Sequence, residues 1–316
     1  MNLTLWIVVF IGTLIVLVKA ADYFIEAAEK IGGALKINPF VIGVTVVALG
    51  TSLPELITSL IAVFEDNTEI VIGNVVGSNI ANFGLVMAFV AIISKRIVLK
   101  TNVMVVEMPF FLGSTFLVSI MMLDGTFEMF DGIVACLGMV LFIVYTIKNK
   151  PEEEPEHEKE EESKLPMAAV MLFFVSGVAI YFSAKYNIDA VLKIAEILNV
   201  GTEVVAQTAV ALGTSLPELL VSVAAARKKN LEIAVGNLIG SNIFNSFAVL
   251  GIPALIAPLV VPNQMLMFSI PLMIMITIIF FVMMITNRVN RWQGYFLLLS
   301  YLFFLVNIIK DAVIPA

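Results

Sequence analysis

Residues 47–56 of the chain read VALGTSLPEL, and the same ten letters return at residues 210–219. A second pair follows at the same offset of 163, because GNVVGSNIAN at residues 73–82 returns as GNLIGSNIFN at residues 236–245. Without a gap, residues 47–86 and 210–249 share 23 of 40 letters. An internal repeat of this kind indicates that the fold is built from two copies of one structural unit.

The composition around this repeat is typical of a membrane protein. The chain has 316 residues, of which 60% are hydrophobic and 14% charged, and its mean hydropathy is +1.03. Soluble domains are about half apolar and a quarter charged. Since about 20 apolar residues span a bilayer as a helix, we expect an all-α membrane protein with ten transmembrane helices. They lie near residues 3–20, 38–64, 69–94, 102–123, 129–147, 166–184, 201–226, 231–260, 263–286 and 292–312.

The distribution of basic residues predicts the orientation in the membrane. Following the chain through ten helices places fourteen of its eighteen Lys and Arg residues on one side, among them Lys95, Arg96 and Arg288. Loops rich in Lys and Arg are cytoplasmic, so we expect a multi-pass protein of the cell membrane with both termini extracellular. Each half holds five helices, an odd number, so the second copy enters the membrane from the opposite side. The two repeats are therefore inverted.

The domain organisation follows from the same count. We expect a first five-helix repeat at residues 1–148, an acidic cytoplasmic linker at residues 149–165 and a second, inverted repeat at residues 166–316. The linker is rich in Glu and too charged to fold alone. A regulatory calcium sensor is the alternative for it, but it lacks the glycine turn and the ligand spacing of a dedicated calcium loop.

Glu55 and Glu218 occupy the same position in the two copies, inside predicted helices. A carboxylate at membrane depth costs about 2.5–3.5 kcal/mol, and such residues line ion pathways or pair with other groups. No Lys or Arg occurs at residues 37–94, 194–226 or 230–287. The counter-charge is therefore a proton or a mobile cation, and either fits a transporter.

Hydroxyl and amide side chains repeat together with the glutamates. Four-residue spacing stacks Thr51 on Glu55 and Ser78 on Asn82, and the second copy repeats this with Thr214, Glu218, Ser241 and Asn245. We expect helix interruptions at Gly50, Pro54, Gly73 and Gly77 and at their mates Gly213, Pro217, Gly236 and Gly240, which would free backbone carbonyls for a cation. Such an all-oxygen site suits a hard cation such as calcium, which takes 6–8 oxygen ligands.

The alternative for these small residues is close helix packing, because Gly, Ser and Thr let membrane helices approach one another. Packing does not explain a glutamate without a basic partner in both halves. Ser59 and Ser222 fit either role. Four further asparagines do not share the face of Ser78, namely Asn74, Asn79, Asn237 and Asn242. We expect their side chains to form hydrogen bonds between helices. Glu107 has no repeat mate.

The repeated segments resemble those of a known family. ALGTSLPEL with GNVVGSNIAN, and ALGTSLPEL with GNLIGSNIFN, look like the two alpha-repeats of the cation/calcium exchanger superfamily, and most resemble its archaeal and bacterial sodium/calcium exchangers. The resemblance implies a bundle of eight helices, across which two long, tilted helices, the first and the sixth, slide to give alternating access. It also implies an exchange of several sodium ions for one calcium ion, with both ions as substrates.

Carried over position by position, the resemblance implies a set of ion ligands. They are the side chains of Glu55, Glu218, Thr51, Ser52, Thr214, Ser215, Ser78, Asn82, Ser241 and Asn245, with the backbone carbonyls of Ala48 and Ala211. One position departs from part of the family, since some archaeal relatives and the potassium-dependent branch carry an aspartate where this chain has Asn245. Two formal charges remain in the site, which argues against potassium coupling.

Other functions fit the residues less well. A proton/calcium antiporter would use the same two glutamates, and a cation channel would more naturally repeat its filter between subunits. An intramembrane enzyme needs a nucleophile with a base, or a catalytic metal, whereas His157 lies in the linker and Cys136 in an apolar run. We expect a secondary transporter in a lipid bilayer, acting as a monomer, with no cofactor and no nucleic-acid partner.

Overall fold

The computed structural model describes residues 3–35, 37–99, 107–148, 166–197, 215–286 and 288–313, and these are almost entirely helical. The linker at residues 149–165 and the predicted helical residues 201–214, with Ala211 and Thr214, lie outside the described residues. In chain order the helices, with η for a π-helix, are α1 (Leu3–Ala34), α2 (Pro39–Ile42), η1 (Gly43–Val47), α3 (Ala48–Phe64), α4 (Thr68–Ala81), η2 (Asn82–Met87), α5 (Ala88–Ser94), α6 (Glu107–Met121), α7 (Met129–Lys148), α8 (Met167–Ile197), α10 (Leu216–Arg227), α11 (Leu231–Phe244), η3 (Asn245–Val249), α12 (Leu250–Ala254), η4 (Met265–Ser269), α13 (Ile270–Met284) and α14 (Arg291–Val313).

The apolar runs of the sequence form helices of membrane-spanning length. Seven helical stretches in the described part of the chain are long and apolar enough to cross a bilayer by length and composition. Large apolar side chains also point outward from them, such as Phe130 on α7 and Phe174 on α8, which are 73% and 66% exposed. An outward apolar face is expected where lipid, and not water, surrounds the helices.

α1 and α8 are longer than the apolar runs that predicted them. We expected the first and sixth segments to end near residues 20 and 184, but α1 continues to Ala34 and α8 to Ile197. Charged residues end an apolar run without ending a helix. Glu26 and Lys30, for example, form an ion pair of 2.7 Å one turn apart within α1, a spacing that stabilises helices.

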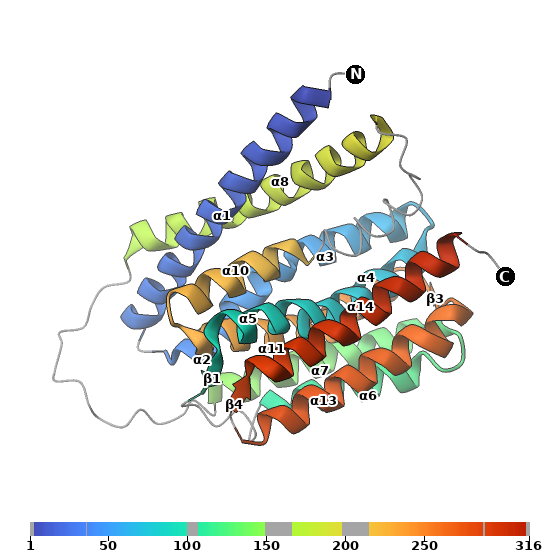
Figure 1. Cartoon of the computed structure of the whole chain (residues 1–316). Helices are drawn as coiled ribbons and strands as arrows, with labels where there is room; N and C mark the ends of the chain where they lie inside the picture. Colours follow the sequence, from blue (N-terminus) through green and yellow to red (C-terminus); the bar gives the residue numbers. More distant parts are fainter. Residues whose placement is uncertain are drawn as a thin grey trace.

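These two long helices lie side by side, across the rest of the bundle (Figure 1). The rings of Phe24 on α1 and Phe173 on α8 stack with their centroids 4.2 Å apart. Farther along, the Asn187 side chain of α8 donates to the Thr13 hydroxyl of α1 at 3.0 Å. α1 and α8 therefore form a pair held together by aromatic and polar contacts.

α11 lies at the centre of the remaining helices. The whole stretch Leu231–Ala254 is buried, and α11 packs against α2, η1, α3, α6 and α10. Its glycines make this possible, because a Cβ at Gly236 would lie 2.6 Å from the carbonyl oxygen of Phe40. A Cβ at Gly240 would overlap the carbonyl oxygen of Val44 and lie 2.7 Å from the Cβ of Ala48.

The expected interruptions at the described glycines were wrong, whereas Gly213 lies outside the described residues. α4 is unbroken through Gly73 and Gly77, as is α11 through Gly236 and Gly240, because the second pair serves close packing. α3 also continues through Gly50 and Pro54, although Pro54 has no N–H to donate to the Gly50 carbonyl. The irregular backbone instead takes the form of π-helices, and two of them, η2 and η3, begin at the repeat mates Asn82 and Asn245.

Two short antiparallel ribbons, which the sequence did not predict, join the halves of the chain. β1 (Arg96–Val98) pairs with β4 (Arg288–Asn290), and β2 (Thr126–Phe127) pairs with β3 (Leu259–Val260). At the offset of 163, β1 corresponds to β3 and β2 corresponds to β4. Each ribbon therefore joins a loop of one repeat to a loop of the other, and the pseudo-symmetry extends well beyond the matching letters.

The packing of α11 predicts that Gly240→Ala destabilises the protein. The added methyl group must push α11 away from η1, and overpacking of this kind costs about 1–3 kcal/mol. We expect the midpoint of thermal unfolding in detergent to fall by several degrees. The control is Gly113→Ala on α6, since Gly113 is exposed and no described atom lies within 4 Å of the point that the added methyl group would occupy. Equal unfolding temperatures for the two variants would contradict the close approach of α11 and η1.

Candidate functional site

The two glutamates of the repeat lie on α3 and α10, deep inside the bundle. Glu55 is 0% exposed and Glu218 is 1% exposed. Glu55 follows Pro54 within α3, and Glu218 follows Pro217 in the first turn of α10. The two copies thus bury the same side chain directly after a proline, although α3 is helical before its proline and the described part of α10 begins at Leu216.

The two glutamate helices meet across the repeat interface. The hydroxyl of Ser52, which precedes Glu55 on α3 by about one turn, donates to Glu218 Oε1 at 3.3 Å. The ion pairs within the described ranges, Lys30 with Glu26 and Lys193 with Glu196, are both at the surface. Neither glutamate has a basic partner there.

Six oxygen atoms of the predicted ligand side chains are buried and have no hydrogen-bond partner among the described residues. They are both carboxylate oxygens of Glu55, Oε2 of Glu218, Oγ of Ser215 and Oδ1 of Asn82 and Asn245. A buried polar atom without a partner costs about 1–3 kcal/mol, so such a group of acceptors is unusual in a folded protein. The arrangement is what a cation that accepts oxygen ligands requires.

Asn82 and Asn245 are oriented by a crossed pair of hydrogen bonds. Asn82 Nδ2 donates to Asn242 Oδ1 at 2.8 Å, and Asn245 Nδ2 donates to Asn79 Oδ1 at 3.2 Å. Each bond is the repeat mate of the other. Because the amide nitrogens are used between helices, the amide oxygens are left to face elsewhere. π-Helical turns, as in η2 and η3, often occur at functional sites.

Thr51 connects the first copy to the second. Its hydroxyl donates to Asn237 Oδ1 at 3.0 Å, and it lies 3.3 Å from the Ser241 hydroxyl and from the Ala48 carbonyl oxygen. Ser78 is also buried, with 2% exposure. Of the twelve predicted ligand residues, ten are described and all of these are buried, whereas Ala211 and Thr214 lie outside the described residues.

A second layer of repeated polar residues supports the glutamate helices. Asn74 Nδ2 donates to the Ser59 hydroxyl and to the backbone carbonyl of Glu55, both at 3.0 Å. Its mate Asn237 donates to the Ser222 hydroxyl, also at 3.0 Å. The expected role of these asparagines as hydrogen bonds between helices is confirmed, and Ser59 and Ser222 are their acceptors.

Glu107 lies outside the repeated segments and on a different helix, α6, from the two repeated glutamates. It is the first residue of α6 and is only 4% exposed. A position at the start of a helix would lead one to expect greater exposure. No hydrogen bond or ion pair in the described residues joins it to Glu55 or Glu218. The sequence offered no second copy of it from which a shared role could be inferred.

The family model described as sodium/calcium exchanger protein matches residues 5–148 and 168–310 of the chain. The chain is 33% identical to "Sodium/calcium exchanger MaX1" of Methanosarcina acetivorans, over 93% of this chain and 95% of that one. It is also 33% identical to "Inner membrane protein YrbG" of Escherichia coli, over 78% of each.

A solved structure of the sodium-calcium exchanger NCX_Mj, soaked with sodium and no calcium, superimposes with a TM-score of 0.85 at 31% identity. The match covers 97% of this chain and all of that one. These likenesses confirm the fold class expected from the sequence, ten transmembrane helices in two inverted five-helix repeats. They also confirm the resemblance on which the ligand set was based, and the chain belongs to the sodium/calcium exchanger protein family, as a multi-pass membrane transporter.

Proposed function

We propose that this protein is a secondary antiporter that exchanges calcium for sodium. The observation that carries the proposal is the set of six buried oxygen atoms without partners on the predicted ligand residues, Glu55 and Glu218 included, with no ion pair of either glutamate to a Lys or Arg among the described residues. Two carboxylates balance one calcium ion or two sodium ions. Competition of the two ions for the same oxygens couples their transport, because occupancy by one excludes the other.

The proposed ligand set is the one implied by the family resemblance. It consists of Glu55, Glu218, Thr51, Ser52, Thr214, Ser215, Ser78, Asn82, Ser241 and Asn245, with the carbonyls of Ala48 and Ala211. Two geometric observations support it. Ser52, Thr51 and Ser241 lie at the interface of the two copies. The amide nitrogens of Asn82 and Asn245 donate to other asparagines, and this leaves their amide oxygens without a hydrogen-bond partner among the described residues. All the atoms come from one chain, so we propose that a monomer is sufficient.

We further propose that alternating access comes from the movement of α1 and α8 as a pair across the other helices. An asymmetry between the repeats supports this. α1 packs extensively against α10, whereas the equivalent contact of α8 with α3 is slight. Two hydrogen bonds accompany the first contact, since Lys228 Nζ donates to the Asp22 carbonyl at 2.8 Å and Asn230 Nδ2 to Glu29 Oε1 at 3.1 Å. Loss of these contacts and gain of the equivalent ones would expose the site to the other side.

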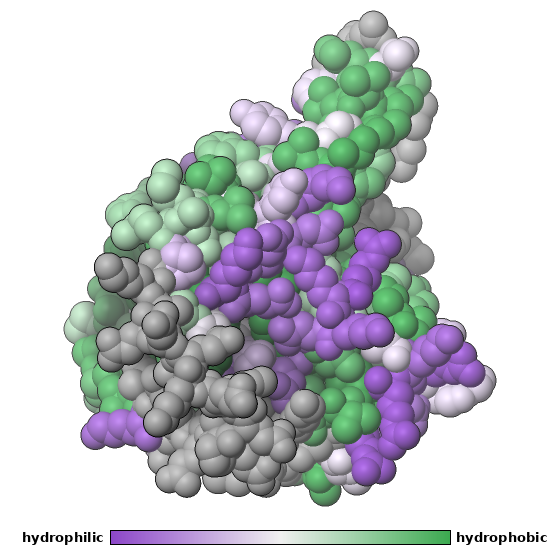
Figure 2. Space-filling view, turned by 90° about the vertical axis from the view of Figure 1, so that its left-hand side faces the viewer, coloured by the Kyte–Doolittle hydropathy of each residue, from purple (hydrophilic) through white to green (hydrophobic). Residues whose placement is uncertain are grey.

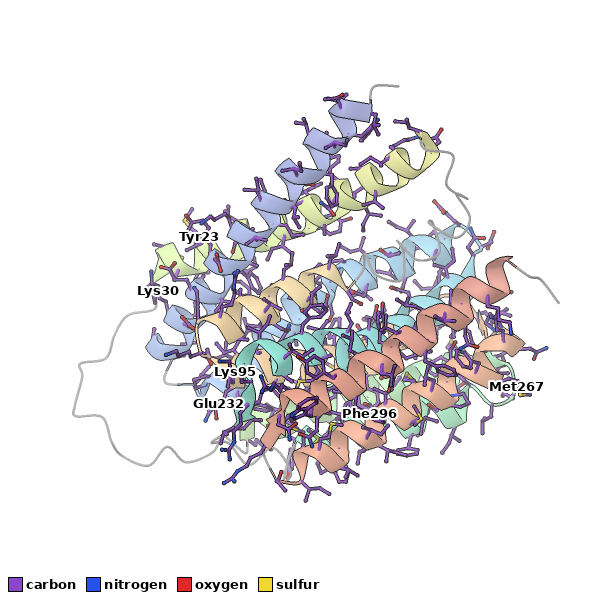
Figure 3. The ribbon with its side chains drawn as sticks, viewed as in Figure 1. Tyr23, Lys30, Lys95, Glu232, Met267 and Phe296 are labelled. Carbon is purple, nitrogen blue, oxygen red and sulfur yellow. The ribbon has the colours of Figure 1, made fainter. Side chains whose placement is uncertain are left out.

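The proposed orientation puts the termini outside the cell and the acidic linker, residues 149–165, in the cytoplasm between a first repeat at residues 1–148 and a second at residues 166–316. The positive-inside rule supports it. Lys95 and Glu232 lie at one end of the bundle and Met267 at the other (Figure 3). Lys95, Arg96, Arg227, Lys228, Lys229, Arg288 and Arg291, all exposed, belong to the cytoplasmic loops of this arrangement.

The two glutamates should be essential. Glu55→Gln or Glu218→Gln removes one of the two negative charges that balance a bound calcium ion. Loss of one partner of a buried charge pair, here glutamate and calcium, costs about 3–5 kcal/mol. We expect uptake of calcium-45 into proteoliposomes to fall at least about 100-fold in either variant. Glu107→Gln is the control, and we expect it to leave uptake largely intact. Normal transport by either site variant would rule out the proposed site.

The coupling ion can be identified in proteoliposomes loaded with calcium and free of potassium. We expect calcium efflux to follow an imposed inward sodium gradient and to ignore a pH gradient of either direction. Efflux that follows the pH gradient without external sodium would instead assign the glutamates to proton exchange. Single-channel currents in a planar bilayer would indicate a channel.

The crossed asparagines should tune calcium affinity. Asn79→Ala removes the acceptor that holds the amide of Asn245, so the free oxygen is no longer oriented. A buried hydrogen bond contributes about 0.5–1.5 kcal/mol, which predicts an apparent KM for calcium raised about 3- to 10-fold with little change in maximal rate. Ser246→Ala is the matched control, because it removes only the acceptor of the Asn79 amide nitrogen, 3.1 Å away. Equal effects of both variants would show that general packing, and not the orientation of Asn245, matters.

A further inference from the structure

The β1–β4 ribbon carries a concentrated positive charge that transport does not use. Arg96 pairs with Asn290 and Val98 with Arg288, while Ile97 and Val289 between them are fully buried. Since side chains alternate along a strand, Arg96 and Arg288 both lie on the exposed face of the ribbon. They occupy diagonal positions, which are about 7–8 Å apart in an antiparallel pair. Two guanidinium groups at this separation can reach the same phosphate.

Two more cations adjoin this pair. The backbone N–H of Arg291 donates to the carbonyl of Lys95 at 3.1 Å, so these residues lie next to each other at the end of the ribbon. All four cations are exposed, and none forms an ion pair among the residues that the structure describes. Four positive charges this close together repel one another, although no two of them lie directly opposite across the strands. An anion bound among them would remove this repulsion.

The surrounding charges do not supply that anion. Glu29 and Glu232 line a hollow beside Val98, but they share it with Lys228 and Lys229, and Glu29 already accepts a hydrogen bond from Asn230. Hydrophilic side chains gather over much of this end of the molecule, as Figure 2 shows. The four cations are therefore exposed and are not neutralised by an ion pair with a described acidic residue.

The position of the ribbon relative to the membrane indicates the source of the anion. α14 starts directly after β4, and an exposed stripe runs along it through Trp292, Tyr295, Leu299 and Val306, which are 71%, 46%, 63% and 62% exposed. The rings of Trp292 and Tyr295 lie at the end of this stripe, 5.7 Å apart. Trp and Tyr are enriched where a transmembrane helix meets the headgroup layer, so we expect the four cations next to them to lie at the level of the lipid phosphates.

We propose that Arg96 and Arg288 on the β1–β4 ribbon, with Lys95 and Arg291 beside them, bind the phosphate groups of anionic phospholipids. Arg is suited to this because its planar group binds phosphate with two parallel hydrogen bonds, and each basic residue near an anionic membrane surface adds attraction. The ribbon joins the loop before α6 to the loop before α14. A lipid bound here would hold loops of both repeats to one leaflet.

Tryptophan fluorescence gives a test that does not depend on transport. The chain has two tryptophans, so Trp6→Phe leaves Trp292, beside the four cations, as the only one. The variant is reconstituted into phosphatidylcholine vesicles that contain an equal minor share of either brominated phosphatidylglycerol or brominated phosphatidylcholine. We expect the brominated anionic lipid to quench Trp292 at least about twofold more, because the ribbon enriches it locally. The preference should decrease as salt is raised and should survive added inorganic phosphate.

Charge-matched variants complete the test. In the Trp6→Phe background, Arg96→Gln with Arg288→Gln should reduce the quenching ratio to parity, while Arg227→Gln with Lys229→Gln, which removes two exposed charges from another cytoplasmic loop, should preserve it. Unchanged quenching by brominated phosphatidylcholine shows that Trp292 keeps its depth. If the first pair does not fold, Lys95→Gln with Arg291→Gln decides. Equal quenching by both lipids in the starting protein, a preference that survives loss of the ribbon charges, or its removal by inorganic phosphate would overturn the proposal.

Discussion

Two carboxylates buried in an apolar bundle, without a Lys or Arg beside them in the described structure, are the constraint on which the other features depend. Water cannot solvate Glu55 and Glu218 at 0% and 1% exposure, and ionised groups in such surroundings need another source of compensation. The hydroxyl and amide oxygens of the other predicted ligands add to the demand for positive charge, because they too are buried acceptors to which no described residue donates a hydrogen bond. In the exchange that we propose, different cations supply this positive charge in turn.

The pseudo-two-fold relation of the repeats explains how the site is built and held. Asn79 and Asn242 each accept from the asparagine that begins the opposite repeat's π-helix, so the two halves orient each other's amides. The two β-ribbons join the same halves at their loops. These connections link the two halves of the bundle at several points, while α1 and α8 are attached mainly to each other and to α10. A pair of helices packed in this way is compatible with the movement that we propose for it.

Much of the fold was predictable because a membrane restricts the possibilities. Only helices satisfy their own backbone hydrogen bonds in lipid, so apolar runs could be read as helices, and the exact repeat of GTSLPE identified both glutamates. The predictions failed where a residue has two possible physical roles. Gly236 and Gly240 were interpreted as helix interruptions, but they are sites of close contact with the backbone of Phe40 and Val44. The lengths of α1 and α8 were underestimated because charged residues such as Glu26 and Lys30 continue the helix by pairing within it.

The sequence alone determined the number of helices, their inversion and the identity of the two central acids, since these depend on hydropathy, on an odd helix count and on letters repeated at one offset. Only the tertiary structure decided which oxygens lack partners, that the irregular turns are π-helices at Asn82 and Asn245, and that Arg96 and Arg288 share one face of a ribbon. These features join residues 160 or more positions apart. Their geometry follows from how the two halves pack against each other, which no local pattern in either half contains.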